Sequence, residues 1–334
     1  MSVNPPAVRV SNLTKRYMSG DMPVTAIDDI SFEINQRTIV GILGPNGAGK
    51  TTLTKMMLGL VIPTGGEVRL MGIDPHSHPA EAYHHASAML EGARNIYWRL
   101  TVRENLEFFS SLVGISPRVA KERHEELLTV LNLVEKADER VNDLSRGMKQ
   151  KVSLACTLVR NTSVLFLDEP TLGLDVESSI AMRREIRDLV DREGRTVILS
   201  SHDMDVIEDL CDRVIILNGG AIVADDSVGN LTDLFRSQAY DIRLEGRVPE
   251  TLKHHMEREF VIESWETSYN GVTSFEVVLE DGYGLYEIID HLSTSELGIE
   301  SIESRQPDLE TAFLELTNLT DADSKIAGDG DELS

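Results

Sequence analysis

The sequence predicts an α/β fold built around a parallel sheet, and three observations support this prediction. First, three short runs are rich in apolar and β-branched residues, as doubly buried strands are; they span residues 39–43, 164–167 and 196–200. Second, segments with apolar residues at helical spacing separate these runs, and such alternation is typical of parallel sheets. Third, a polar or glycine-rich stretch follows each run. Because ligands of open parallel sheets bind at the carboxyl ends of the strands, we expect these three stretches to converge.

The loop after the first run carries the phosphate-binding pattern G-x-x-x-x-G-K-[ST]. It consists of Gly44, Pro45, Asn46, Gly47, Ala48, Gly49, Lys50 and Thr51, followed by Thr52. Glycines let backbone N–H groups converge on phosphate oxygens, and the N-terminus of the following helix, expected at 51–60, adds partial positive charge. In this pattern Lys50 is expected to reach the β- and γ-phosphates, and the Thr51 hydroxyl to ligate Mg²⁺. A chance glycine-rich turn is the alternative, but the flanking strand and helix favour binding of a nucleoside triphosphate.

Two acidic residues follow the second apolar run. Asp168 is placed to hold Mg²⁺, directly or through water, and Glu169 to polarise the water that attacks the γ-phosphate. A strand followed by Asp-Glu is weak evidence by itself. Together with an upstream phosphate loop it is a strong indication of nucleotide hydrolysis.

Composition limits the function classes. The 334 residues favour two domains, and a formal net charge of −24 disfavours non-specific binding to nucleic acid. We find no apolar run long enough to span a membrane and no signal-peptide pattern at the N-terminus. Cys156 and Cys211 are interpreted as reduced core thiols of a cytosolic protein. The acidic, lysine-poor composition suits a halophilic source or an ordinary acidic protein, and composition alone leaves both open.

The rest of the chain predicts three further structural features. Short alternating runs at 8–10, 26–27, 31–34 and 67–70 indicate a small antiparallel sheet around the phosphate loop. Residues 102–133 have helical periodicity with a break at 114–117, which indicates an inserted helical subdomain. After residue 236 the pattern restarts as strand, helix, two strands, helix and strand, followed by a helix at 309–316. That order predicts a small ferredoxin-like α+β module. The expected domains are therefore 6–228, 236–318 and an acidic, disordered tail at 319–334.

Three motifs in fixed order give the chain a close resemblance to ATP-binding cassette (ABC) ATPases over residues 6–225. They are Leu144-Ser145-Arg146-Gly147-Met148-Lys149-Gln150, Thr171-Leu172-Gly173-Leu174-Asp175 and Ser201-His202-Asp203. The resemblance implies that Ser145 and Gly147 cap the γ-phosphate of ATP held by the opposite subunit. It further implies that Asp175 lies at the dimer interface and that His202 contacts the γ-phosphate and orients the attacking water. Tyr17 matches the aromatic that stacks on adenine in this family, with an ordinary strand-edge tyrosine as the alternative.

Two positions depart from the family pattern. Arg146 and Met148 stand where the signature has Gly and Gln, but Ser145 and Gly147 are retained. Glu91 stands where the family has the glutamine that links Mg²⁺ and water to the membrane partner. A carboxylate can still ligate Mg²⁺ but has no amide N–H donor. We interpret Glu91 as a functional substitute, and the alternative is a plain loop acid with the role of the glutamine lost.

The resemblance implies the ATPase subunit of an ABC transporter, with ATP and Mg²⁺ as cofactors. Its expected partners are a separate integral-membrane permease and a second, head-to-tail copy of itself, but not nucleic acid. The expected location is the cytoplasm, on the inner face of the cell membrane. Residues 306–316 resemble the ending of drug-resistance and natural-product exporters of the type 2 branch, which favours export. The alternatives are a soluble ABC ATPase acting on ribosomes or DNA, and a regulatory ATP-binding protein with weak turnover.

Two other patterns carry less weight. The loop histidines His76, His78, His84 and His85 lack the spacing of a metal site and are interpreted as a solvated loop. The apolar stripe Leu106, Phe109 and Val113 lies in the inserted subdomain, which receives a coupling helix of the membrane subunit in the family. We expect this stripe to pack in the core or to form part of the partner surface, or to do both through different residues.

Overall fold

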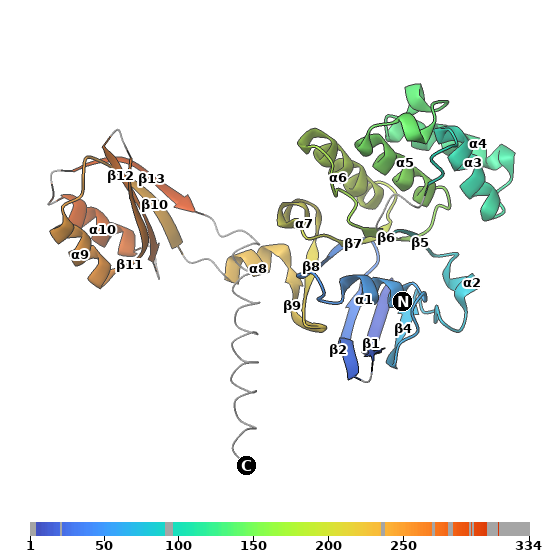
Figure 1. Ribbon diagram of the computed structural model, residues 1–334, viewed down its shortest axis with the longest axis horizontal. Helices are drawn as coiled ribbons and strands as arrows, with labels where there is room; N and C mark the ends of the chain where they lie inside the picture. The colour runs from blue at the N-terminus through green and yellow to red at the C-terminus, as the bar shows by residue number, and fades with distance from the viewer. Residues whose placement is uncertain are drawn as a thin grey trace, which may run out of the picture. The chain divides into compact units, whose positions relative to one another are not determined.

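The computed structural model describes residues 5–20, 22–90, 96–234, 238–268, 271–279, 283–293, 295, 297–305 and 313 (Figure 1). The chain divides into two compact units, one extending to Val228 and one from Gly229 to Glu315. No helix among the described residues is long and apolar enough to cross a membrane. The domain limits 6–228, 236–318 and 319–334 stay predictions.

A six-stranded sheet forms the centre of the first unit. Its strands, in spatial order, are β5 (Ala86–Met89), β6 (Val164–Asp168), β7 (Thr196–Ser200), β3 (Ile39–Leu43), β8 (Arg213–Asn218) and β9 (Ala221–Ser227). All neighbours are parallel except β8 and β9. Every residue of β3, β6 and β7 is buried, which explains why the apolar runs predicted these three strands.

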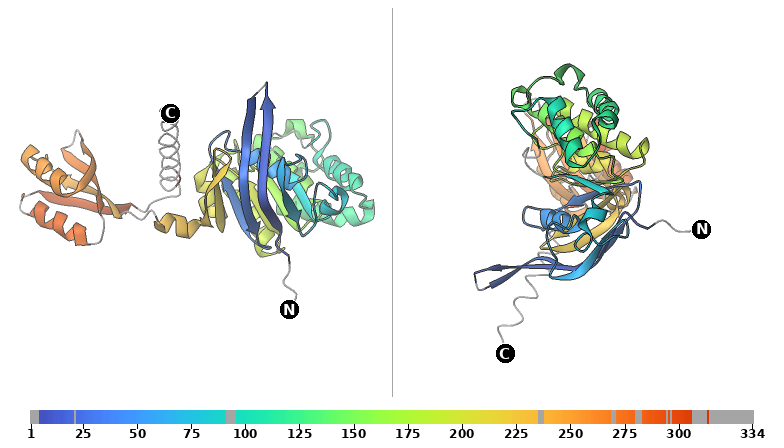
Figure 2. Two further views of the ribbon diagram at one scale, coloured as in Figure 1. Left: turned by 90° about the horizontal axis from the view of Figure 1, so that it is seen from below. Right: turned by 90° about the vertical axis from the view of Figure 1, so that its right-hand side faces the viewer.

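A second, three-stranded antiparallel sheet confirms the small sheet expected around the phosphate loop. Its order is β2 (Met22–Ile34), β1 (Val8–Ser19) and β4 (Gly65–Leu70). The β1–β2 hairpin is far longer than the apolar pattern indicated, and Figure 2 shows it as two long neighbouring strands. Helix α1 (Lys50–Met57) buries Leu53, Met56 and Met57 in a core that also holds Ile27 of β2 and Phe166 of β6. That core fixes the phosphate loop between the two sheets.

The inserted helical segment has the break that the sequence predicts. Helix α3 (Val102–Leu112) begins with a capping box formed by Thr101 and Glu104, and α4 (Pro117–Val130) begins with proline in its first turn.

The other elements of the first unit are α2 (Pro79–Ala82), the 3₁₀ turns η2 (Val134–Lys136) and η3 (Val141–Asp143), α5 (Arg146–Leu158), α6 (Val176–Asp191) and α7 (Met204–Leu210). Cys156 and Cys211 are both free and buried, as expected, and burial raises the pKa of both thiols.

Helix α8 (Val228–Leu234) starts at the last described residue of the first unit, and the second unit continues from it as the predicted ferredoxin-like module. Its elements are β10 (Gln238–Glu245), α9 (Glu250–Glu259), β11 (Val261–Thr267), β12 (Val272–Leu279), α10 (Tyr283–Ser293) and β13 (Gly298–Arg305). The sheet order is β11-β12-β10-β13 with antiparallel neighbours, which is the ferredoxin-like arrangement. The predicted helix at 309–316, apart from the buried Phe313, and the tail at 319–334 lie outside the described residues.

Candidate nucleotide site

Three adjacent strands of the central sheet bring the candidate site together. β7 lies between β6 and β3, and Ser200 pairs in register with Asp168 on one side and Ile42 on the other. The phosphate loop, the Asp168-Glu169 pair and the Ser201-His202 pair therefore leave the sheet at the same edge. This convergence is the one expected from the three polar stretches in the sequence.

Backbone geometry determines which residues the phosphate loop can contain. Gly49 caps helix α1 with φ of 105°, in the left-handed region that side chains disfavour. A Cβ added there would lie 2.5 Å from the backbone oxygen of Ala26, and one added at Gly44 would lie 2.4 Å from that of Leu217. The neighbouring strands thus approach the loop so closely that only glycine fits at these two positions.

Lys50 extends across the phosphate loop. Its Nζ donates hydrogen bonds to the carbonyl oxygens of Gly44, at 2.6 Å, and Pro45, at 3.2 Å. Burial lowers the pKa of Lys50, while the nearby charges of Glu169 and Asp168 act in the opposite direction. The ammonium group is therefore held between the loop and the two acids, where a polyphosphate bound by the loop would meet it. Pro45, Asn46 and Gly47 form the exposed part of the loop, whereas Ala48 is buried.

Asp168 is a buried carboxylate at the end of β6, and its side chain is only 5% exposed. The Ser200 hydroxyl donates a hydrogen bond to Asp168 Oδ1. Thr51 and Thr52, in the first turn of α1, are half-buried. The Thr51 hydroxyl and the Asp168 carboxylate are hard oxygen donors, so the groups present at this edge suit a Mg²⁺ ion.

Glu169 is held in an unusual backbone conformation. Its φ is 50°, in the left-handed region that non-glycine residues rarely adopt. The backbone N–H of Glu169 donates to the Ser200 carbonyl at 3.0 Å, and Gln150 Nε2 donates to the Glu169 carbonyl at 3.3 Å. These two bonds hold the strained turn and fix where the carboxylate points.

The Glu169 carboxylate contacts the residues that follow β7. Its Oε1 lies 2.9 Å from His202 Nδ1, and Ser201 Oγ lies 3.5 Å from Oε2. The Glu169 side chain is 13% exposed, whereas that of His202 is 59% exposed. The acid is thus recessed, with the imidazole beside it on the accessible side, and Glu169 lines two clefts of about 440 and 300 Å³. The larger cleft also contains Asp168, Gln150 and Arg146, and the smaller one His202.

The signature residues lie at the start of α5. Ser145 caps the helix, and its side chain accepts a hydrogen bond from the backbone N–H of Met148 at 3.2 Å. Gly147 is buried so tightly that an added Cβ would lie 3.0 Å from Ser178 Oγ of α6. Asp175 in turn caps α6, accepting from the Ser178 backbone N–H at 2.8 Å and hydroxyl at 2.9 Å. These two bonds hold the pKa of Asp175 below its usual range. Ser178 therefore links the two helix starts, while the contacts of Ser145, Gly147 and Asp175 with a second copy stay predictions.

The roles of two further predicted site residues, Tyr17 and Glu91, stay predictions. Tyr17 lies on β1 with 41% of its surface exposed, and Lys15 Nζ sits 4.9 Å from the centre of its ring. Stacking of Tyr17 on adenine stays a prediction. Glu91 lies outside the described residues, so its role also stays a prediction.

The structure gives three residues contacts with the acids Asp168 and Glu169 that the sequence analysis did not assign. Ser200, Ser201 and Gln150 each contact Asp168 or Glu169. Hydroxyl residues at the end of a buried apolar run were the available signal for the two serines.

Of the loop histidines, His76 has Nε2 3.0 Å from the Val61 carbonyl and Nδ1 3.5 Å from Asp74, so its ring bonds within the fold.

Comparisons with known proteins agree with this fold. The family model for ABC transporters matches residues 27–172. The chain is 34% identical to the ABC transporter ATP-binding protein NatA of Bacillus subtilis over 231 residues, covering 69% of this chain and 94% of NatA. It is 38% identical to the Nod factor export ATP-binding protein I of Neorhizobium galegae, covering 60% of this chain and 57% of that protein. It is 35% identical to the probable multidrug ABC transporter ATP-binding protein YbhF of Escherichia coli, of which it spans 38%.

A solved structure gives the same result. A dimeric ATP-binding cassette in a post-hydrolysis state, bound to ADP and phosphate, matches with a TM-score of 0.60 and 26% identity. The match covers 66% of this chain and 98% of that structure. The fold and the strand-end site therefore define a phosphate-loop ATPase. The chain belongs to the ABC transporter family, as an ATP-binding and ATP-hydrolysing protein.

Proposed function

We propose that this ATPase drives export through a separate membrane permease, by closing on ATP as a head-to-tail dimer. The observation that carries the hydrolytic part is the recessed Glu169 carboxylate, 2.9 Å from His202 and beside the phosphate loop. The transport part is supported by the relatives, whose names describe ABC transporter ATP-binding proteins and include Nod factor export.

In the proposed reaction, the loop N–H groups and Lys50 bind the ATP phosphates. Thr51 and Asp168 would hold Mg²⁺, whose positive charge would stabilise the negative charge that develops on the phosphate oxygens. Glu169 takes a proton from the attacking water, whose oxygen bonds to the γ-phosphorus as the bond to the bridging oxygen breaks, releasing ADP. His202, hydrogen-bonded to Glu169, orients that water and contacts the γ-phosphate.

The second copy completes the site in this proposal. Ser145 and Gly147 of one copy cap the nucleotide of the other, and Asp175 lies at the interface. A solved relative with 26% identity is a dimer, which supports this arrangement. Because the closed dimer has a higher affinity for ATP than for ADP, hydrolysis reopens the dimer and supplies the free energy for transport.

The helical insertion offers a surface for the permease. Of the predicted apolar stripe, Leu106 is buried in the core whereas Val113 is 37% exposed. Leu112, Val119 and Val130 on the same two helices are 64%, 66% and 45% exposed. These side chains support docking of a membrane partner, which would place the protein at the inner face of the cell membrane. The formal charge of −24 weighs against the alternative of action on ribosomes or DNA.

The test is co-purification from detergent-solubilised native membranes, with tagged full-length protein carrying Glu169→Gln to prolong the ATP-bound state. We expect one integral-membrane protein to be recovered with ATP and Mg²⁺. Val119→Asp should abolish recovery, while Met22→Asp should not, although Met22 on β2 is even more exposed than Val119, at 74% against 66%. Recovery of ribosomal or chromosomal proteins without a membrane partner would refute the transporter assignment.

A further inference from the structure

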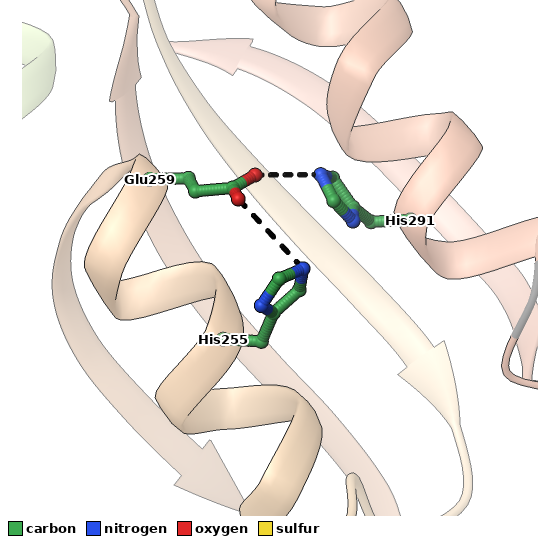
Figure 3. Close-up of side chains that lie close together, drawn as sticks. All are labelled: His255, Glu259 and His291. Carbon is green, nitrogen blue, oxygen red and sulfur yellow. Dashed lines mark ion pairs between the residues drawn. The ribbon is translucent and has the colours of Figure 1, made fainter.

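Three metal-ligating side chains meet on the surface of the second unit, far in sequence from the nucleotide motifs. His255 and Glu259 come from α9 and His291 from α10, and Figure 3 shows all three pointing toward one another. Glu259 Oε2 lies 2.8 Å from His291 Nε2, and Glu259 Oε1 lies 3.8 Å from His255 Nε2. One ligand atom from each residue lies within 4.8 Å of the other two.

The fold holds these residues at fixed positions. His255 and Glu259 are four residues apart and so share one face of α9. Met256 and Leu292, their immediate neighbours in sequence, are fully or almost fully buried in the core of this unit, together with Ile288. The core therefore anchors the two helices directly beside the cluster. The His255 and His291 rings also pack edge to face, with centres 5.0 Å apart.

The spacing suits coordination of a single ion. Ligand atoms about 2.0–2.1 Å from a tetrahedral zinc ion lie about 3.3 Å from one another. The contacts of 2.8 and 3.8 Å reach different oxygens of the Glu259 carboxylate, and one ligand atom from each residue lies within 4.8 Å of the other two. Side-chain rotations that move these atoms by up to about 1.5 Å would therefore close the site around one ion. The side chains of His255, Glu259 and His291 are 52%, 47% and 28% exposed, which leaves a path for the ion and a position for water.

The donor set selects a class of metal. Two imidazole nitrogens and one carboxylate oxygen suit Zn²⁺ and other divalent first-row transition ions, whereas Mg²⁺ and Ca²⁺ prefer oxygen donors alone. We propose that the C-terminal unit binds one Zn²⁺-type ion through His255, Glu259 and His291, linking α9 to α10. This site uses no residue of the nucleotide site or of the surface proposed to contact the permease, so its test does not depend on the proposed function.

Zinc titration of the full-length, EDTA-treated protein, without nucleotide and against a competing chromogenic chelator, tests the proposal. We expect one tight site per chain. His291→Gln and His255→Gln, on the two different helices, should each weaken that site at least a hundredfold. The matched control is His254→Gln, since His254 is the adjacent histidine on α9 and is 77% exposed outside the cluster. It should leave zinc affinity unchanged.

Cobalt provides a second readout that a purely structural role would not change. Bound Co²⁺ should give visible absorption bands of a low-coordinate site, and both ligand variants should lose them while far-UV circular dichroism stays the same. The proposal is overturned if the unmodified protein binds no zinc at millimolar concentration, or if His254→Gln weakens binding as much as His291→Gln. In either case Glu259 serves only as an ion-pair partner of the two histidines.

Discussion

In the first unit the groups proposed to bind ATP follow the ends of buried strands, whereas in the second unit the candidate metal ligands project from two partly exposed helices. Gly44, Gly49 and Glu169 are fixed by backbone conformation and by the close approach of neighbouring strands. His255, Glu259 and His291 are positioned by helix packing and by their contacts with one another. The first site thus depends on backbone geometry and the second on side-chain placement.

This difference predicts how each site responds to change. A backbone-anchored site should be damaged by small substitutions that alter conformation, and its damage should extend to stability. A site formed by side chains on stable helices should lose its ligand without loss of folding. The two units also each contain one tryptophan, Trp98 and Trp265, so each can be followed separately by fluorescence.

The largest effect should follow from Glu169→Gln. The amide keeps the shape of the side chain but cannot take the proton of the attacking water, so phosphate release should fall by about 10²–10⁴-fold. ATP affinity and zinc binding should both persist, because neither uses this proton transfer. Phosphate release measured at saturating ATP, with the exposed Glu122→Gln on α4 as control, checks the prediction. A loss of less than tenfold would instead favour the regulatory alternative, in which the unmodified protein already turns over poorly.

A smaller effect separates two glycines of the same loop. Gly49→Ala should lower the free energy of unfolding by about 1–3 kcal/mol and weaken ATP binding, because φ is 105° and Cβ would meet the Ala26 oxygen at 2.5 Å. Gly47→Ala keeps the unfavourable φ of 87° but has open space around Cβ, so it should cost less. Urea unfolding monitored by Trp98 in a Trp265→Phe background measures the difference. Equal costs would show that close approach of β2 does not constrain the loop.

The sequence predicted those parts of the molecule that are determined by residues next to one another in the chain. The apolar run 39–43 and the periodic segment 250–259 match β3 and α9 residue for residue, since burial on both faces and helical spacing are local patterns. The phosphate loop was likewise found from its spacing. The sequence did not predict the strand order, the polar edge strand β9 or the contact of Ser200 with Asp168, because these features depend on which strands become neighbours. The His255–Glu259–His291 cluster was not predicted for the same reason, because its residues meet only when α9 and α10 pack together.

The smallest effect concerns a buried histidine of the first unit, in contrast to the exposed pair of the second. His124 on α4 is 4% exposed, its Nε2 lies 2.6 Å from Ser110 Oγ, and burial lowers its pKa below the ordinary 6.5. The unfolded chain therefore binds a proton at a higher pH than the folded one. Stability of this unit should be greatest above pH 6.5 and should decrease as the pH falls from 6.5 through the lowered pKa.

Unfolding of the Trp265→Phe protein, followed through Trp98 between about pH 7.5 and 5, measures this decrease across the ordinary range of histidine pKa values. His124→Gln should flatten the profile, because the amide can hydrogen-bond to Ser110 but does not titrate in this range. His254→Gln, which removes an exposed histidine of the other unit, should leave it unchanged. If His124→Gln retains the full pH dependence, other groups of the first unit cause it. The contrast between a buried, neutral histidine and accessible, metal-binding ones would then no longer hold.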